Sequence, residues 1–212
     1  LLSAITLIYA NFVALRQTQL QRFFAYSGIA HSGFLLIPLV AGGPEAISTL
    51  IFYLIVYAFA TFGCFAVIST LNKQTPGVSL NDLQGLFHRS PFLGTVLSVC
   101  LLTLAGFPPT AGFFAKFYTL KLAYQSGYFM LLIIALLTTV LAAYYYLRII
   151  NVILKKSPEA VTAEKSPFPY VAVGSVCLVA IAILSCFPLR DGKDFKDLKD
   201  EKAIHSPLAL LR

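Results

Sequence analysis

The chain has 212 residues, of which 58% are hydrophobic and only 12% are charged, with a formal net charge of +7 and a mean hydropathy of +0.80. A soluble domain needs charged side chains along its whole length, but between positions 92 and 147 the only charged residues are Lys116 and Lys121. The composition therefore excludes an ordinary soluble domain and is typical of a protein that lies in lipid.

Six apolar segments predict an all-α membrane protein with about six transmembrane helices, one of them discontinuous. The expected spans are residues 1–15, 23–40, 46–71, 91–124, 128–154 and 170–187. Together they form a transmembrane domain over residues 1–188, and a polar tail rich in Lys-Asp pairs follows over residues 189–212. We interpret the tail as a solvated segment, or as a docking helix. Because Leu1 stands inside an apolar run without a signal peptide, we expect the chain to begin within a longer protein.

The basic residues indicate how the spans are oriented. Alternating the sides of successive spans places one group of basic residues at the same membrane surface: Arg16, Arg22, Lys73, Arg89, Lys155, Lys156 and Lys165. The loops at the opposite surface hold Glu45 and, near a helix end, Lys121. The first surface should face the cytoplasm, matrix or stroma, and this topology explains the net charge better than nucleic-acid binding does.

The fourth span carries a break in its middle. Its 34 residues, 91–124, would make a helix of about 50 Å, whereas a bilayer core is about 30 Å thick. Two adjacent prolines, Pro108 and Pro109, lie between Gly106 and Gly112. Proline removes a backbone donor and glycine permits sharp turns, so this segment predicts two half-helices joined by an unwound stretch.

Lys116 follows Gly112 by one helical turn and should lie close to mid-membrane. A lysine there costs about 2.5 to 3.5 kcal/mol on insertion scales, so it indicates a functional site facing a cavity or a partner. Because a low-dielectric setting disfavours the ammonium form, modest changes in nearby charge could make it hold or release a proton. The alternatives are that Lys116 extends to the interface, or that it pairs with a carboxylate of another subunit.

His31 is the other titratable group expected inside a span, and its ring can both donate and accept a hydrogen bond. Ser27 precedes it by one turn and could share its face. A buried histidine can also be a hydrogen-bonded core residue, and we interpret Tyr144, Tyr145 and Tyr146 first as packing or interface residues. The four cysteines stand singly in apolar runs, which indicates core residues rather than a metal or redox site.

Three ordered motifs resemble the antiporter-like membrane subunits of respiratory complex I, the NADH-quinone oxidoreductase. Residues 102–118, Leu-Thr-Leu-Ala-Gly-Phe-Pro-Pro-Thr-Ala-Gly-Phe-Phe-Ala-Lys-Phe-Tyr, resemble the broken twelfth helix. Residues 17–33 resemble the loop and tenth helix, and residues 144–148 resemble the thirteenth. A lysine followed by Phe-Tyr is typical of the subunit N branch, the counterpart of mitochondrial subunit 2, whereas subunit M has a glutamate there.

The resemblance covers residues 1–188 and implies the ninth to fourteenth helices, the C-terminal part of a fourteen-helix subunit. It implies inverted five-helix repeats, of which the second passes protons through the broken-helix lysine toward the positive side. Lys116 and His31 would then be the proton-relay residues. The first repeat is not in this chain, the tail matches no part of the family, and Gln21 stands where relatives have a lysine.

We therefore expect a membrane-arm subunit that forms a proton half-channel, in the bacterial inner membrane or an organellar energy-converting membrane. No cofactor is expected in this chain, because NADH and quinone would act at other subunits. The expected partners are other membrane subunits of complex I, the lipid bilayer and protons, and not nucleic acid. Two alternatives remain open: a cation/proton antiporter subunit of the Mrp type, and a purely structural membrane subunit.

Overall fold

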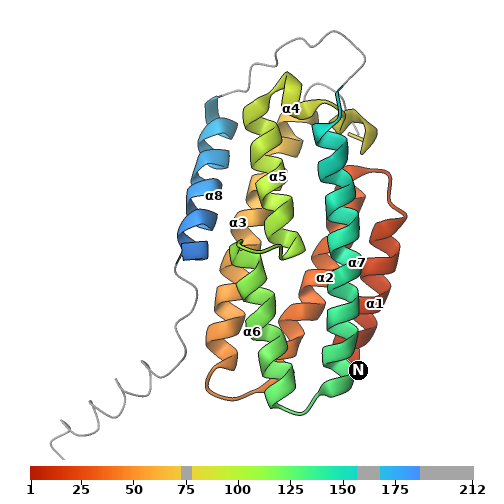
Figure 1. Ribbon diagram of the computed structural model, residues 1–212, viewed down its shortest axis with the longest axis vertical. Coiled ribbons are helices and arrows are strands. Elements are labelled where there is room, and N and C mark those ends of the chain that lie inside the picture. The colour runs from red at the N-terminus through yellow and green to blue at the C-terminus, as the bar shows by residue number, and fades with distance from the viewer. Residues whose placement is uncertain (73–77, 157–167, 187–212) are drawn as a thin grey trace, which may run out of the picture.

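The computed structural model describes residues 1–72, 78–156 and 168–186, which form a bundle of helices along one long axis (Figure 1). These residues contain no named strand, only one isolated bridge between Gln19 and Ser79. The expected all-α membrane fold is confirmed. The polar tail, with its docking-helix alternative, lies outside the described residues.

The helices follow the apolar segments of the sequence. They are α1 (Leu2–Leu15), α2 (Leu20–Ala41), α3 (Ala46–Asn72), η1 (Asn81–Leu83), α4 (Leu86–Arg89), α5 (Pro91–Ala105), α6 (Ala111–Gln125), α7 (Phe129–Leu154) and α8 (Phe168–Cys186). Among the described residues, α2, α3 and α7 are long and apolar enough to cross a membrane, and α1, α5 and residues 171–186 of α8 are shorter apolar helices. Helix α2 begins three residues before the expected position, so Arg22 lies in its first turn.

The segment before α5 differs from the loop expected there, because it contains the two short helices η1 and α4. Asp82 Oδ2 accepts hydrogen bonds from the backbone N–H and the hydroxyl of Ser79, at 2.7 and 2.8 Å. Gly85 adopts a φ of +72° between the two helices, a conformation that glycine reaches without strain. Short helices that depend on local side-chain hydrogen bonds leave no hydrophobic periodicity in the sequence, so the sequence did not predict them.

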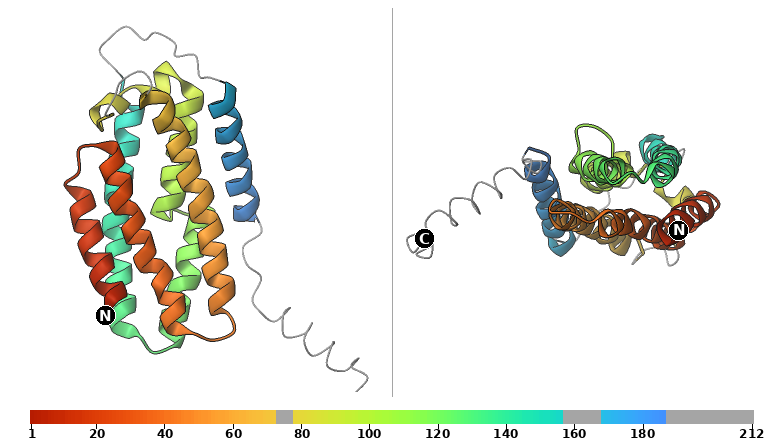
Figure 2. Two further views of the ribbon diagram at one scale, coloured as in Figure 1. Left: turned by 180° about the vertical axis from the view of Figure 1, so that it is seen from behind. Right: turned by 90° about the horizontal axis from the view of Figure 1, so that it is seen from below.

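The helices form two facing rows. Seen from one end, α1, α2 and α3 lie in one row, α5, α6 and α7 lie opposite, and α8 lies beside α3 (Figure 2). Helices α5 and α6 lie end to end in the second row (Figure 1). The junction between them therefore faces the middle of α2 and α3.

The basic segments gather at one end of the bundle, where backbone hydrogen bonds join them. The N–H of Leu80 donates to the carbonyl of Thr18 at 2.9 Å, and the N–H of Leu20 donates to the carbonyl of Val78 at 3.1 Å. At the other end, Ser126 Oγ donates to the carbonyl of Ala41 at 3.2 Å. Arg16, Arg89, Lys155 and Lys156 thus share one end, while Lys73 and Lys165 lie outside the described residues. Which end faces the cytoplasm stays a prediction.

The discontinuous helix is present, and its break has a defined backbone path. Helix α5 ends with Gly106 in the left-handed conformation, φ +78°, and the Gly106 N–H donates to the carbonyls of Leu102 and Thr103, each at 3.1 Å. Pro108 and Pro109 follow and have no N–H to satisfy. Helix α6 starts after Thr110, whose N–H donates to the carbonyl of Phe107 at 2.9 Å. The N–H groups of Gly106, Phe107 and Thr110 thus find backbone partners at the break, as apolar surroundings require.

Candidate functional site

Lys116 lies in the second turn of α6 and is only 4% exposed. Its Nζ donates a hydrogen bond to the carbonyl of Ala105, the last residue of α5, at 2.9 Å. The aliphatic part of the side chain passes Gly106 so closely that a Cβ at position 106 would lie 2.8 Å from Lys116 Cδ. The lysine therefore turns back across the break rather than extending toward the interface.

An aromatic ring covers another side of the same amine. Lys116 Nζ lies 5.3 Å from the centroid of the Phe34 ring of α2. That distance is within the range over which a cation interacts with the face of an aromatic ring. The ammonium thus meets a helix C-terminus, which carries partial negative charge, and an aromatic face.

His31 is the centre of a hydrogen-bonded chain between three helices. Its Nδ1 lies 2.9 Å from the hydroxyl of Tyr53 in α3, and its Nε2 lies 3.3 Å from the hydroxyl of Tyr146 in α7. The Tyr146 hydroxyl is also hydrogen-bonded to Ser27 Oγ, one turn before His31. All four side chains are at most 5% exposed.

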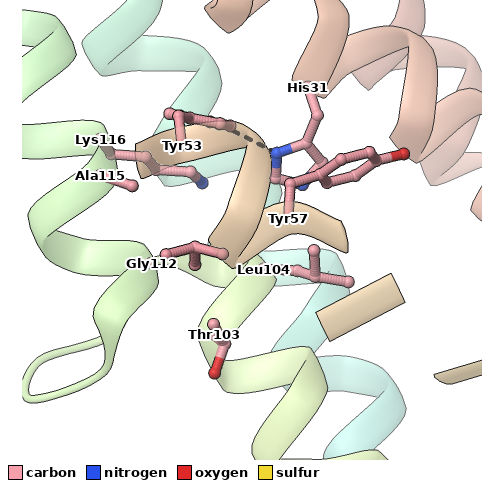
Figure 3. A pocket seen from close by; sticks show the side chains of 9 residues that line it. His31, Tyr53, Tyr57, Thr103, Leu104, Gly112, Ala115 and Lys116 are labelled. Atoms are coloured by element: carbon pink, nitrogen blue, oxygen red, sulfur yellow. Dashed lines mark hydrogen bonds between the residues drawn. The ribbon is translucent and has the colours of Figure 1, made fainter. Parts of the chain in front are cut away.

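A small cavity brings the two predicted site residues together. It has a volume of about 10 Å³, at the lower limit of what one water molecule needs. Figure 3 shows Lys116 and His31 approaching it from opposite sides. The lining residues are His31, Tyr53, Val56, Tyr57, Thr103, Leu104, Gly112, Ala115 and Lys116. Of the break residues, Gly112 lines the cavity and Gly106 contacts the lysine stem, whereas Pro108 and Pro109 are not part of the lining.

The arrangement can hold and move protons. Each hydroxyl of the chain can donate and accept, and a neutral imidazole donates from one nitrogen while it accepts at the other. The chain can therefore adopt two opposite directions, depending on the histidine tautomer. Two positive charges facing each other across so small a cavity would repel strongly, which favours one proton at a time on Lys116 and His31.

Carboxylates are remote from this site in the described part of the chain. The acidic residues there are Glu45, between α2 and α3, and Asp82, in η1, so they lie at opposite ends of the bundle. The same part of the chain contains no group of three or more His, Cys, Asp or Glu side chains able to hold a metal ion. A carboxylate partner from another subunit remains an alternative for Lys116.

Several contributors were not predicted from the sequence. Tyr53 lies in an apolar helix with many aromatic residues, and nothing in the pattern distinguishes it from a packing residue. Tyr146 was interpreted as a packing residue, yet its hydroxyl joins His31 and Ser27. Phe34 could have been found from its spacing, because residues at i and i+3 share one face of a helix and Phe34 follows His31 by three.

Comparison with known proteins places these features in a family. A family model described as "NADH:quinone oxidoreductase/Mrp antiporter, TM" matches residues 1–142. The chain belongs to this family. It is therefore an integral membrane protein, and its expected resemblance to complex I antiporter-like subunits is confirmed.

Individual relatives agree with this assignment. NADH-quinone oxidoreductase subunit N of Protochlamydia amoebophila is 58% identical over 185 residues, which cover 86% of this chain and 38% of that protein. A chain of respiratory complex I from Thermus thermophilus superimposes with a TM-score of 0.75 at 32% identity, covering 88% of this chain and 42% of the other. A chain of the Mrp complex from Dietzia has a TM-score of 0.72 at 17% identity, covering 91% of this chain and 47% of the other, which shows a shared fold alone. The chain thus spans about two fifths of the length of the curated relative.

Proposed function

We propose that this chain forms a proton half-channel in the membrane arm of a proton-translocating NADH:quinone oxidoreductase of a bacterial inner membrane. The observation that carries the proposal is the buried amine of Lys116, which faces His31 across a cavity with room for one water molecule. The similarity to subunit N supports the identity of the complex. Other membrane subunits and the surrounding lipid are its partners, and NADH oxidation and quinone reduction take place in other subunits.

The proton moves along the hydrogen-bonded chain toward the lysine. A proton that enters from the basic end of the bundle binds the Ser27 oxygen, and the original Ser27 hydroxyl proton moves to the Tyr146 oxygen as the Tyr146 hydroxyl proton moves to His31 Nε2. The proton on His31 Nδ1 moves to the Tyr53 oxygen, and the original Tyr53 hydroxyl proton moves to a water molecule in the cavity, which donates another of its protons to Lys116. Lys116 receives it and becomes the ammonium ion. One proton enters and one is delivered, so no residue keeps a net charge except the lysine.

The lysine then releases its proton toward the opposite end of the bundle. Because the acidic residues of the described chain are remote, charge changes in neighbouring subunits provide the signal for release. This requirement fits a half-channel, in which the remainder of the path belongs to other parts of the assembly. Lys116 is thus a protonation site whose proton is released in response to charge changes in its surroundings.

The proposal is tested by Lys116→Met in the full-length, assembled complex in sealed vesicles. Methionine keeps the length and apolar character of the stem but cannot carry a proton. We expect proton translocation per NADH oxidised to fall severely, while Lys121→Met, on the same helix, leaves the ratio unchanged. An unchanged ratio for Lys116→Met would overturn the relay role and favour a structural subunit, and sodium-dependent transport without NADH would favour an Mrp-type antiporter.

A further inference from the structure

Phe34 of α2 belongs to a buried apolar cluster and also lies next to Lys116. The residue is 2% exposed, and its ring stacks on Tyr53 with 6.2 Å between centroids and 17° between planes. The same ring lies 5.3 Å from Lys116 Nζ. Phe34 is therefore in contact both with the hydrogen-bonded chain and with the amine that receives its proton.

The charged amine has few other sources of stabilisation. An ammonium group has three N–H donors, and the structure gives one of them a partner, the Ala105 carbonyl at 2.9 Å. A buried charge needs pairing or hydrogen bonds, and within the described residues the carboxylates lie at the ends of the bundle. The negative face of an aromatic ring interacts more strongly with a cation when water is excluded. At 4% exposure Lys116 meets that condition.

We infer that Phe34 is a positioning residue that, together with the Ala105 carbonyl, forms the seat in which Lys116 carries its proton. This inference rests on the proposed relay function and deepens it. The ring attracts the ammonium form and has little attraction for the neutral amine. The seat therefore favours loading of the lysine after a proton has crossed the cavity, without a carboxylate that would hold the proton too tightly.

Other titratable groups near Lys116 come from the helices packed against α6. Helix α2 presents His31, and α3 presents Tyr53 and Tyr57 to the cavity. Helix α5 presents the Ala105 carbonyl, which does not titrate, and the Thr103 hydroxyl points away from the cavity and donates to the Val99 carbonyl (Figure 3). Tyr146 of α7 hydrogen-bonds to His31 and not to Lys116. Cys177 of α8 lies against Gly63 of α3. Substitutions at position 34 change none of these side chains themselves, and Phe34→Tyr also keeps the ring that stacks on Tyr53.

The test is the pH profile of proton translocation per NADH oxidised, in the full-length assembled complex in sealed vesicles. For Phe34→Leu we expect the alkaline limb, where Lys116 loses its proton, to move to lower pH by about one unit, because losing the ring lowers proton affinity about tenfold. Phe34→Met is a second variant without a ring, with a volume that packed sites tolerate well. Phe34→Tyr retains the ring and should restore the limb to its original pH.

The matched control is Phe24→Leu, which removes another buried ring from α2, ten residues and about 15 Å away along the helix. Its profile should coincide with that of the unmodified complex. Assembly of the Phe34→Leu and Phe34→Met complexes is measured first by native electrophoresis. The pH profile is then recorded for whichever of them assembles. An alkaline limb that does not move in an assembled Phe34→Leu or Phe34→Met complex overturns the inference. If Lys116→Met abolishes translocation in the same assay, the relay itself still stands; if it does not, the relay fails as well.

Discussion

Gly112 of α6 packs directly against the backbone of Thr103 in α5, and a methyl group at position 112 would overlap the Thr103 carbonyl. The adjoining ends of the two half-helices are therefore in direct backbone contact. This contact fixes the distance from the start of α6 to the end of α5, and with it the reach of Lys116 to the Ala105 carbonyl. The geometry of the site depends on it.

Gly112→Ala should therefore separate the half-helices. Overpacking of this kind typically costs about 1 to 3 kcal/mol, and a backbone group cannot move aside as a side chain can. We expect a lower thermal stability of the assembled complex and a loss of proton translocation. The control is Gly174→Ala in α8, where the added methyl meets side-chain methyl groups of Val96, the nearest at 3.2 Å. Equal stability of the two variants would contradict this prediction.

Tyr146→Phe removes the hydroxyl that joins His31 to Ser27. The ring remains, and with it the edge-to-face contact with Phe23 at 5.8 Å between centroids. The loss leaves buried hydrogen-bonding groups without a partner, at a cost of about 1 to 3 kcal/mol, and interrupts the chain. Proton translocation per NADH should fall, measured by the quenching of a pH-sensitive dye in vesicles. Tyr144→Phe, at a residue 61% exposed, should behave like the unmodified complex.

His31→Gln keeps a donor and an acceptor but cannot exchange them as an imidazole does by changing tautomer. Position 31 would still hydrogen-bond with its neighbours, so we expect normal assembly. Translocation should fall by about two orders of magnitude, the lower range of what positioned acid–base groups contribute. His88→Gln, in α4 at the end of the bundle, is the control. A fully active His31→Gln complex would show that His31 is a core residue.

The orientation of the bundle is tested by introducing one exposed cysteine at a time and labelling it from either side of the membrane. Thr18 and Gln125 are exposed and lie at opposite ends. A membrane-impermeant maleimide should modify Thr18→Cys only from the cytoplasmic side and Gln125→Cys only from the other side. Cys186 is exposed, so it is replaced by serine in both variants. The reverse pattern would contradict the predicted topology.

The sequence predicted the parts of the fold that depend on local chemistry. Long apolar runs determine where helices form in lipid, and Pro108 with Gly106 determines where one of them must stop. Lys116 was recognisable because a charge in an apolar run has a high cost. The turns around Asp82 were missed, because short helices depend on a few side-chain bonds rather than on periodicity.

The surroundings of Lys116 and His31 depend on which helices become neighbours. Tyr53, 22 residues from His31, and Tyr146, 115 residues away, reach its two nitrogens only because α3 lies beside α2 and α7 lies in the facing row. Phe and Tyr are common at lipid-facing and core positions alike, so residue type does not indicate this role. The partner of Lys116 is a backbone carbonyl, which every residue has.

The hydrogen-bonded series Ser27–Tyr146–His31–Tyr53 also limits how many protons the proposed relay can pass. After a proton has passed, each hydroxyl points the opposite way and the imidazole has changed tautomer. A second proton cannot follow until all of them have turned back. The hydrogen-bonded series would thus pass a single proton per cycle. The number of protons translocated through it would be set by the reorientation of its hydrogen bonds and not by the supply of protons.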